Sequence, residues 1–235
     1  MSNVASSTLP RSWWWGFALY AVVAAEHVIG LLIPNWSFTT ASKLLLMPLL
    51  AAAVLWASQG EREPARERVL AILILALTFA WLGDGAGTLF PFLPELPVML
   101  ACFAVTHLLY IWLFSRRLAV RRMSAWAALY LLWWIVLLAA LWTSLGALAI
   151  AVALYGIVLG GTAATATACT SLIRWGAVAF LTSDSILAFE LFRPELTPSW
   201  TGSLVMLSYC LGQGMIALGV VRTRTLRRTP SQATA

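Results

Sequence analysis

Eight long runs of apolar residues divide the sequence, and Pro, Gly or charged residues bound each run. A transmembrane helix needs about 20 such residues, with about 17 to 25 tolerated. Hydrophobic residues make up 61% of the chain and charged residues 10%, whereas roughly a quarter of a soluble domain is charged. We therefore predict an all-α polytopic membrane protein, a bundle of eight transmembrane helices. The expected spans are 13–33, 43–57, 69–90, 97–115, 124–142, 145–164, 172–192 and 201–221.

The basic residues are unevenly distributed over this predicted bundle. If the N-terminus, the even-numbered loops and the C-terminus share one side, that side holds thirteen of the fifteen Lys and Arg residues, and the other side keeps Lys43 and Arg193. Cytoplasmic loops are enriched in Lys and Arg, so both termini are predicted to be cytoplasmic. The domain prediction is one eight-helix unit over 1–221, followed by a basic, flexible cytoplasmic tail over 222–235; residues 58–68 are expected to form a solvated cytoplasmic loop.

The net charge of +6 is interpreted as an orientation signal and a contact with lipid headgroups, because no polar domain is present to hold a nucleic acid. Richness in arginine and alanine, with short loops, is typical of a bacterial protein and predicts the cytoplasmic membrane. No obligate protein partner is evident.

Several kinds of catalytic site are excluded by composition. Three isolated cysteines form no CxxC pair and are interpreted as small apolar residues. Two histidines cannot form a His-rich zinc site, and neither an HExxH motif nor a GxSxG motif occurs. We therefore expect no metal and no cofactor. The cysteines are Cys102, Cys169 and Cys210.

The chain contains two aspartates, and both lie inside apolar segments. Asp84 occurs in WLGDGAGTLF and Asp184 in AFLTSDSILAFE. A charge in the hydrocarbon region costs at least about 2.5 to 3.5 kcal/mol, so such residues usually have a function. At about 1.5 Å per residue, each lies roughly 20 Å from the cytoplasmic entry of its helix. A pair of carboxylates suits acid–base chemistry, because one can remain protonated while the other is ionised.

Other polar side chains lie inside the predicted spans, and His107 and Tyr209 reach a similar depth to the aspartates. A single buried His, Tyr or Gln more often forms a hydrogen bond between helices than it catalyses a reaction, and we give Glu26 and His27 that structural interpretation. Lys43 is the one lysine beside fourteen arginines, which suggests a specific contact. The remaining candidates for one polar pocket are Tyr110, Tyr155, Ser183 and Gln213.

Five segments together resemble the YhhN family of integral membrane lysoplasmalogenases, in order and spacing over roughly residues 40 to 220. Leu44 and Thr106 depart from the family pattern, in which proline follows the lysine and alanine precedes the histidine, and the sixth span matches only through Tyr155. The segments are SKLLLMPLL at 42–50, WLGDGAGTLF at 81–90, FAVTHLLY at 103–110, GAVAFLTSDSILA at 176–188 and YCLGQGMI at 209–216.

The resemblance implies an eight-helix enzyme that hydrolyses the vinyl ether of a lysoplasmalogen to a fatty aldehyde and glycerophosphoethanolamine or glycerophosphocholine. Its partners would be the lysophospholipid substrate and membrane lipid. Asp84 and Asp184 are then expected to be the catalytic pair, one an acid and the other a base or cation stabiliser. His107 is expected to orient an aspartate or water. Substrate binding would fall to Lys43, Tyr110, Tyr155, Ser183, Tyr209 and Gln213.

Two alternatives remain open from the sequence. Intramembrane acids also carry protons in transporters, so a proton-coupled transporter of a small lipid or metabolite fits the same residues. Polar groups that lie mainly at one depth favour the enzyme. The other alternative is a family member that has lost activity or acts on a different lysolipid.

Overall fold

The protein is described here by a computed structural model, which covers residues 14–59 and 64–226. Within these residues the chain is all-α, with eight long helices and one helix of four residues, α4. A π-helical turn follows α5, and short 3₁₀ turns flank α6 and precede α7 and α9. The helices are α1 (Trp15–Gly30), α2 (Thr39–Ala57), α3 (Pro64–Asp84), α4 (Ala86–Leu89), α5 (Glu95–Leu113), α6 (Ala128–Leu141), α7 (Ala149–Ala166), α8 (Ser171–Phe192) and α9 (Thr201–Leu226).

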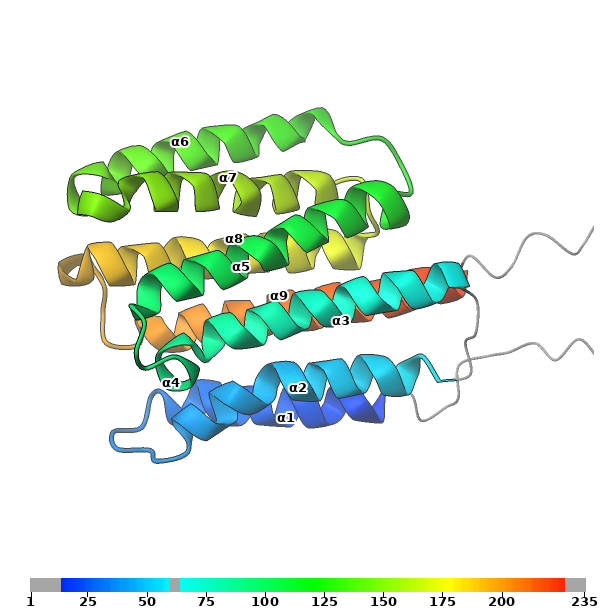
Figure 1. Cartoon of the computed structure of the whole chain (residues 1–235), viewed down its shortest axis with the longest axis horizontal. Helices are drawn as coiled ribbons and strands as arrows, with labels where there is room; N and C mark the ends of the chain where they lie inside the picture. Colours follow the sequence, from blue (N-terminus) through cyan, green and yellow to red (C-terminus); the bar gives the residue numbers. More distant parts are fainter. Residues whose placement is uncertain (1–13, 60–63, 227–235) are drawn as a thin grey trace, which may run out of the picture.

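The long helices run side by side along the length of the molecule, and the connections lie at its two ends (Figure 1). Successive contacts link α1, α2, α3, α5, α7, α8 and α9, and α9 returns to α1, so these helices form a ring. Helix α6 packs against α7 at the edge of the bundle (Figure 1). Its outward side is apolar, with Leu131 61% and Val136 58% exposed. Such a surface is typical of a lipid contact.

Six of the predicted spans are confirmed as helices long and apolar enough to cross a membrane. The two other predicted spans correspond to α1, a shorter apolar helix of 16 residues, and α3, whose first turn carries charged residues. The six candidates are Thr39–Ala57, Glu95–Leu118, Ala125–Ser144, Gly146–Ala166, Ser171–Phe192 and Thr201–Thr223.

Helix α3 differs from its predicted span at both ends. It begins at Pro64, a residue favoured in the first helical turn, so part of the loop predicted over 58–68 is helical. It ends at Asp84 rather than continuing to residue 90, because Gly85 follows and glycine weakens a helix; the short helix α4 begins after it. Asp84 is therefore a helix-terminal residue and not a mid-helix one.

Helices α2 and α9 also extend beyond their predicted spans. Helix α2 begins at Thr39, four residues before the predicted start, and includes Pro48. Helix α9 continues to Leu226, so the first residues predicted as a tail over 222–235 are helical; residues 227–235 lie outside the described part. The spans 124–142 and 145–164 are predicted to be separate, and the structure has a turn there; Gly146 has a φ of 52°, a conformation that glycine adopts at little cost.

Basic residues gather at the end of the bundle where α1 begins and α9 ends (Figure 1). The opposite end, where α8 is joined to α9, carries Arg193, and Lys43 lies near it in the second turn of α2. The alternation of helices thus places the arginines together, as the charge pattern predicts. Those at the basic end are Arg66, Arg68, Arg116, Arg117, Arg121, Arg122, Arg174 and Arg222.

Helices α8 and α9 approach closely through glycines. A Cβ atom added at Gly212 would lie 2.9 Å from the Phe180 backbone nitrogen and 3.0 Å from the Gly176 carbonyl oxygen. Backbone atoms cannot move aside as a flexible side chain can, so even one methyl group must separate the helices.

We expect Gly212→Ala to destabilise the protein by about 1 to 3 kcal/mol, the usual cost of overpacking. The measurement is the thermal midpoint of unfolding in detergent, followed by circular dichroism. Gly202→Ala is the matched control, because its Cβ would approach only a Glu190 carboxylate oxygen at 3.4 Å. Equal midpoints for the two variants would contradict the packing interpretation.

Candidate active site

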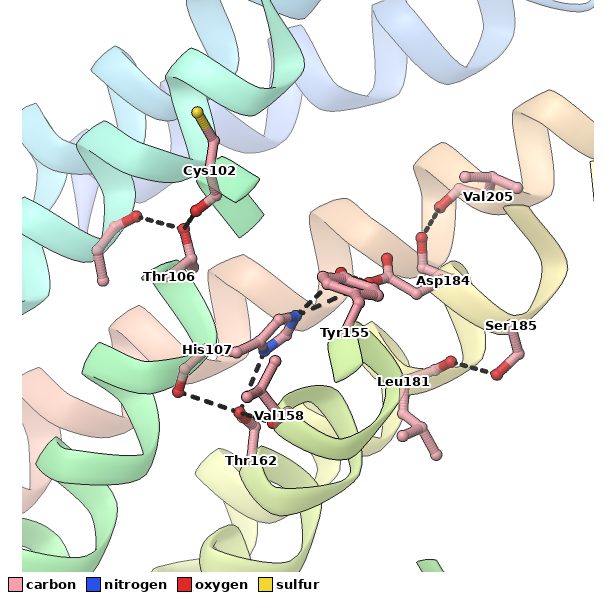
Figure 2. Close-up of polar contacts among 12 residues, drawn as sticks. Cys102, Thr106, His107, Tyr155, Val158, Thr162, Leu181, Asp184, Ser185 and Val205 are labelled. Atoms are coloured by element: carbon pink, nitrogen blue, oxygen red, sulfur yellow. Dashed lines mark hydrogen bonds and ion pairs between the residues drawn. The ribbon is translucent and has the colours of Figure 1, made fainter. Parts of the chain in front are cut away.

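Asp184, on α8, lies at one end of a small polar cluster formed by three helices (Figure 2). The Tyr155 hydroxyl, from α7, donates a hydrogen bond to Asp184 Oδ2. His107, from α5, places Nε2 3.2 Å from the Tyr155 hydroxyl and 3.7 Å from Asp184 Oδ2. The Asp184 side chain is 10% exposed and that of His107 is fully buried. These three predicted residues are therefore brought together.

The second ring nitrogen of His107 is held by a residue that the sequence did not single out. His107 Nδ1 lies 3.1 Å from the Thr162 hydroxyl, which also lies 3.3 Å from the His107 carbonyl oxygen (Figure 2). Thr162 is seven residues after Tyr155 and thus two turns along the same face of α7. That spacing is the signal by which Thr162 could have been found. Together the two residues fix the orientation of the imidazole.

Asp84 belongs to a second polar group at the end of α3. It accepts a hydrogen bond of 2.7 Å from the Tyr209 hydroxyl, on α9. Lys43 and Asp184 both lie close enough to Asp84 to interact with it electrostatically. The two carboxylates are thus within electrostatic range of each other, and a cation accompanies Asp84.

Tyr20, on α1, is a further residue near Asp84 that the sequence did not indicate. It is within electrostatic range of Asp84, and its hydroxyl donates a 2.8 Å hydrogen bond to the Cys210 carbonyl. A tyrosine in the first span, outside the recognised motifs, carried no signal in the sequence.

Two phenylalanine rings lie between the polar groups. Phe103 is 6.0 Å from the Tyr209 ring and 6.1 Å from Phe180, edge to face. Phe180 in turn lies 4.7 Å from the His107 ring and 5.3 Å from Tyr209. A Cβ atom at Gly83 would lie 2.9 Å from the Phe103 ring. The rings form an apolar wall shared by both carboxylate groups.

Three predicted binding residues make other contacts. Tyr110 donates a 2.5 Å hydrogen bond to Gln213 Oε1, and both side chains are fully buried. Ser183 donates to the Val205 carbonyl at 2.9 Å and so links α8 to α9. Successive residues on a helix point about 100° apart, which explains why Ser183 does not face the partners of Asp184. Tyr110 and Ser183 are therefore not brought to either carboxylate, whereas Gln213 also hydrogen-bonds the Tyr209 side chain, the partner of Asp84.

The Glu26–His27 pair joins α1 to the segment that follows it. Trp36 Nε1 donates to Glu26 Oε1 at 2.6 Å, and His27 Nδ1 lies 2.9 Å from the Ser42 hydroxyl. These contacts match the structural interpretation of both residues. Within the described residues, no group of three or more His, Cys, Asp and Glu side chains is arranged to hold a metal ion.

A narrow apolar groove leads to Asp184 from the end of the bundle opposite the arginines. Its free volume is about 60 Å³, and α5, α6, α7 and α8 form its walls. Asp184 and Tyr155 are among its lining residues, so the cluster is accessible from the groove. Its apolar walls include Leu96, Met99, Leu100, Phe103, Leu137, Val152, Leu159, Leu187, Leu191 and Phe192.

Of three comparisons with known proteins, the comparison with protein-family profiles supports the motif resemblance. A search of curated proteins and a search of solved structures each found no match. The profile of the YhhN family matches residues 38–220, a range that includes α2 to α5 and α6 to most of α9, and hence both carboxylates, His107 and Tyr155. Because the match extends over well more than half of the chain and covers all of these residues, the protein belongs to the YhhN family.

Proposed function

We propose that the protein is a lysoplasmalogenase that hydrolyses the vinyl ether bond of an alkenyl-glycerophospholipid. The YhhN family includes lysoplasmalogenases. The observation that carries the proposal is the position of Asp184, an acid that lines an apolar groove beside Tyr155 and close to His107. An apolar groove that ends at a carboxylate suits a single-chain substrate whose reactive bond joins the chain to its headgroup.

The proposal includes a setting in the bilayer. All eight long helices cross the bacterial cytoplasmic membrane, with both termini in the cytoplasm, where the arginines lie. Tyr209, the hydrogen-bond partner of Asp84, is eight residues from the start of α9. Asp184 is eight residues from the end of α8. At about 1.5 Å per residue, both lie about 12 Å from the opposite, outer end of their helices. The substrate would therefore enter from the outer half of the bilayer.

Asp184 is assigned as the acid. Hydrolysis of a vinyl ether begins when a proton is transferred to the outer alkenyl carbon, and the resulting oxocarbenium ion is trapped by water as a hemiacetal. Collapse of the hemiacetal breaks the bond from the former vinyl carbon to the glycerol oxygen, which takes up a proton, and releases the aldehyde. Asp184 reaches the groove in which the chain would lie, and thus the carbon to be protonated.

Asp84 is assigned as the carboxylate that stabilises the oxocarbenium ion. Lys43 lies within electrostatic range of this carboxyl group. The Tyr209 hydroxyl also donates to it. An acid and a carboxylate around such a cation parallel the arrangement in glycosidases.

His107 and Tyr155 are assigned to the return of a proton to Asp184. Tyr155 contacts both partners, so its hydroxyl can accept a proton from His107 Nε2 as it passes its own to Asp184 Oδ2. The chain of contacts therefore connects the acid to the His107 imidazole, a group that can bind and release a proton. The contact with the Thr162 hydroxyl fixes the orientation of the His107 imidazole ring.

Filling the groove is expected to select against long chains. Leu187 lines it three residues beyond Asp184, so Leu187→Trp should raise KM for a long-chain alkenyl lysolipid about tenfold, in proportion to lost apolar contact, and affect a short-chain substrate less. Steady-state kinetics with the two chain lengths measures this. Leu131→Trp, at an exposed position on α6, is the control. An equal rise in KM for both chain lengths would argue against the groove as the chain site.

Product analysis tests the function itself. Purified protein is incubated separately with alkenyl, alkyl and acyl lysophosphatidylethanolamine, and products are identified by mass spectrometry. The expected result is a fatty aldehyde and glycerophosphoethanolamine from the alkenyl lipid alone. A free fatty acid from the acyl lipid would indicate a different lysolipid substrate. No product, with uptake of the intact lipid into sealed vesicles, would favour a transporter.

A further inference from the structure

A cavity at the basic end of the bundle lies apart from the two carboxylates. Its volume is about 340 Å³, and it is formed by the start of α6, the first turns of α8 and the segment before α6. Arg121 and Arg174 contribute to its lining, whereas no Asp or Glu does. The cavity therefore carries two positive charges without a neighbouring carboxylate in its wall.

Both guanidinium groups are positioned by contacts with the protein. Arg121 Nε donates to the Thr167 carbonyl at 2.9 Å, and Arg174 Nη2 donates to the Ser171 hydroxyl at 2.9 Å. Arg174 Nε is buried and makes no hydrogen bond within the described part of the chain. A buried N–H group without an acceptor is unfavourable, so an anionic oxygen in the cavity would satisfy it.

The rest of the lining is suited to an amphiphile. Trp126, Tyr130 and Trp175 contribute aromatic rings, and Leu129 and Val178 contribute aliphatic surface. Tryptophan and tyrosine are enriched at the level of lipid headgroups. Arginine binds phosphate oxygens in a bidentate manner, and basic pockets between transmembrane helices on the cytoplasmic side bind lipid headgroups.

The cavity is too far from Asp184 to hold the phosphate of the proposed substrate. Arg174 and Asp184 are ten residues apart on α8, which corresponds to about 15 Å along the helix axis. Seven covalent bonds separate the phosphorus of a lysoplasmalogen from the outer alkenyl carbon that Asp184 would protonate, at most about 10 Å at about 1.5 Å per bond. The ammonium groups of ethanolamine and choline would also find no carboxylate here.

We propose that this cavity is a separate binding site for the phosphate of an anionic phospholipid, of the phosphatidylglycerol class, with no cation in its headgroup. The two arginines bind the phosphate oxygens, and the upper part of an acyl chain lies against the rings. The site does not depend on the proposed hydrolysis, because none of its residues belongs to the carboxylate groups.

Binding to the purified full-length protein in detergent tests this assignment. Dioctanoyl-phosphatidylglycerol is titrated by calorimetry against the wild type, Arg174→Gln and Arg121→Gln. Arg116→Gln is the control, since it removes the same charge from an exposed position at the same end of the bundle and outside the lining. Dioctanoyl-phosphatidylcholine and inorganic phosphate are titrated as competing ligands.

We expect each pocket variant to bind phosphatidylglycerol at least tenfold more weakly than the wild type, and Arg116→Gln to stay within twofold. Phosphatidylcholine should bind at least tenfold more weakly than phosphatidylglycerol. Wild-type affinity in both pocket variants would overturn the site. Inorganic phosphate that binds as tightly as the lipid would overturn the lipid assignment. If Arg174→Gln fails to fold, the affinity of the Arg121→Gln variant for phosphatidylglycerol decides the result, because Arg121 is exposed.

Discussion

Asp184→Asn is expected to lower the rate of aldehyde release from alkenyl-lysophosphatidylethanolamine by about 10³-fold, within the range of about 10² to 10⁴ that general acid catalysis supplies. An amide keeps the size of the side chain and its hydrogen bond from Tyr155 but has no acidic proton to give to carbon. The loss should therefore appear in kcat, with KM nearly unchanged. Aldehyde is measured with a coupled dehydrogenase on purified protein in detergent.

Glu190→Gln is the matched control for this variant. Glu190 lies on the same helix, undergoes the same change from carboxylate to amide and is not among the lining residues of the groove. We expect its rate to stay within twofold of the wild type. Turnover by Asp184→Asn at the rate of the control would exclude Asp184 as the acid.

Asp84→Asn is the second change with a large expected effect, a loss of about 10² to 10³ in kcat, comparable to the removal of one electrostatic stabiliser of a transition state. The oxocarbenium ion would lose its anionic partner, and Lys43 would be left as an uncompensated positive charge in the same site. The combined change Asp84→Asn with Lys43→Met should recover part of the activity.

Two outcomes would contradict the role given to Asp84. One is a wild-type kcat in the single variant. The other is a double variant that is no faster than Asp84→Asn alone, since the charge of Lys43 would then be irrelevant. Glu95→Gln, at the start of α5 with its carboxylate beside Gly87, provides a control for the loss of a carboxylate near the same end of the bundle.

The helices were largely predictable because hydrocarbon imposes a simple rule on length and composition. Six of the predicted apolar runs are helices long and apolar enough to cross a membrane. The arginines correctly indicated which connections lie at the same end of the bundle. The ends were less predictable: α3 stops at Asp84 and α2 includes Pro48. Composition sets how far a helix can extend, whereas local turns and packing decide where it ends.

The candidate site was predictable in its residue types and depth rather than in its pairings. The sequence placed His107 and Asp184 at one level, but their connection through Tyr155 depends on how α5, α7 and α8 are rotated. Rotation also separates Ser183 from Asp184. Thr162 and the Phe103 ring were missed because neither residue stands out in an apolar sequence.

The central claim is that water adds to the vinyl carbon after an acid protonates its neighbour. The most direct test is turnover of alkenyl-lysophosphatidylethanolamine by the wild type in water enriched in ¹⁸O, with mass spectrometry of the glycerophosphoethanolamine. Because the glycerol oxygen is retained when the vinyl carbon is attacked, this product should contain no ¹⁸O and should appear together with one aldehyde per substrate. Incorporation of ¹⁸O into the glycerophosphoethanolamine, or an absence of aldehyde, would contradict the account.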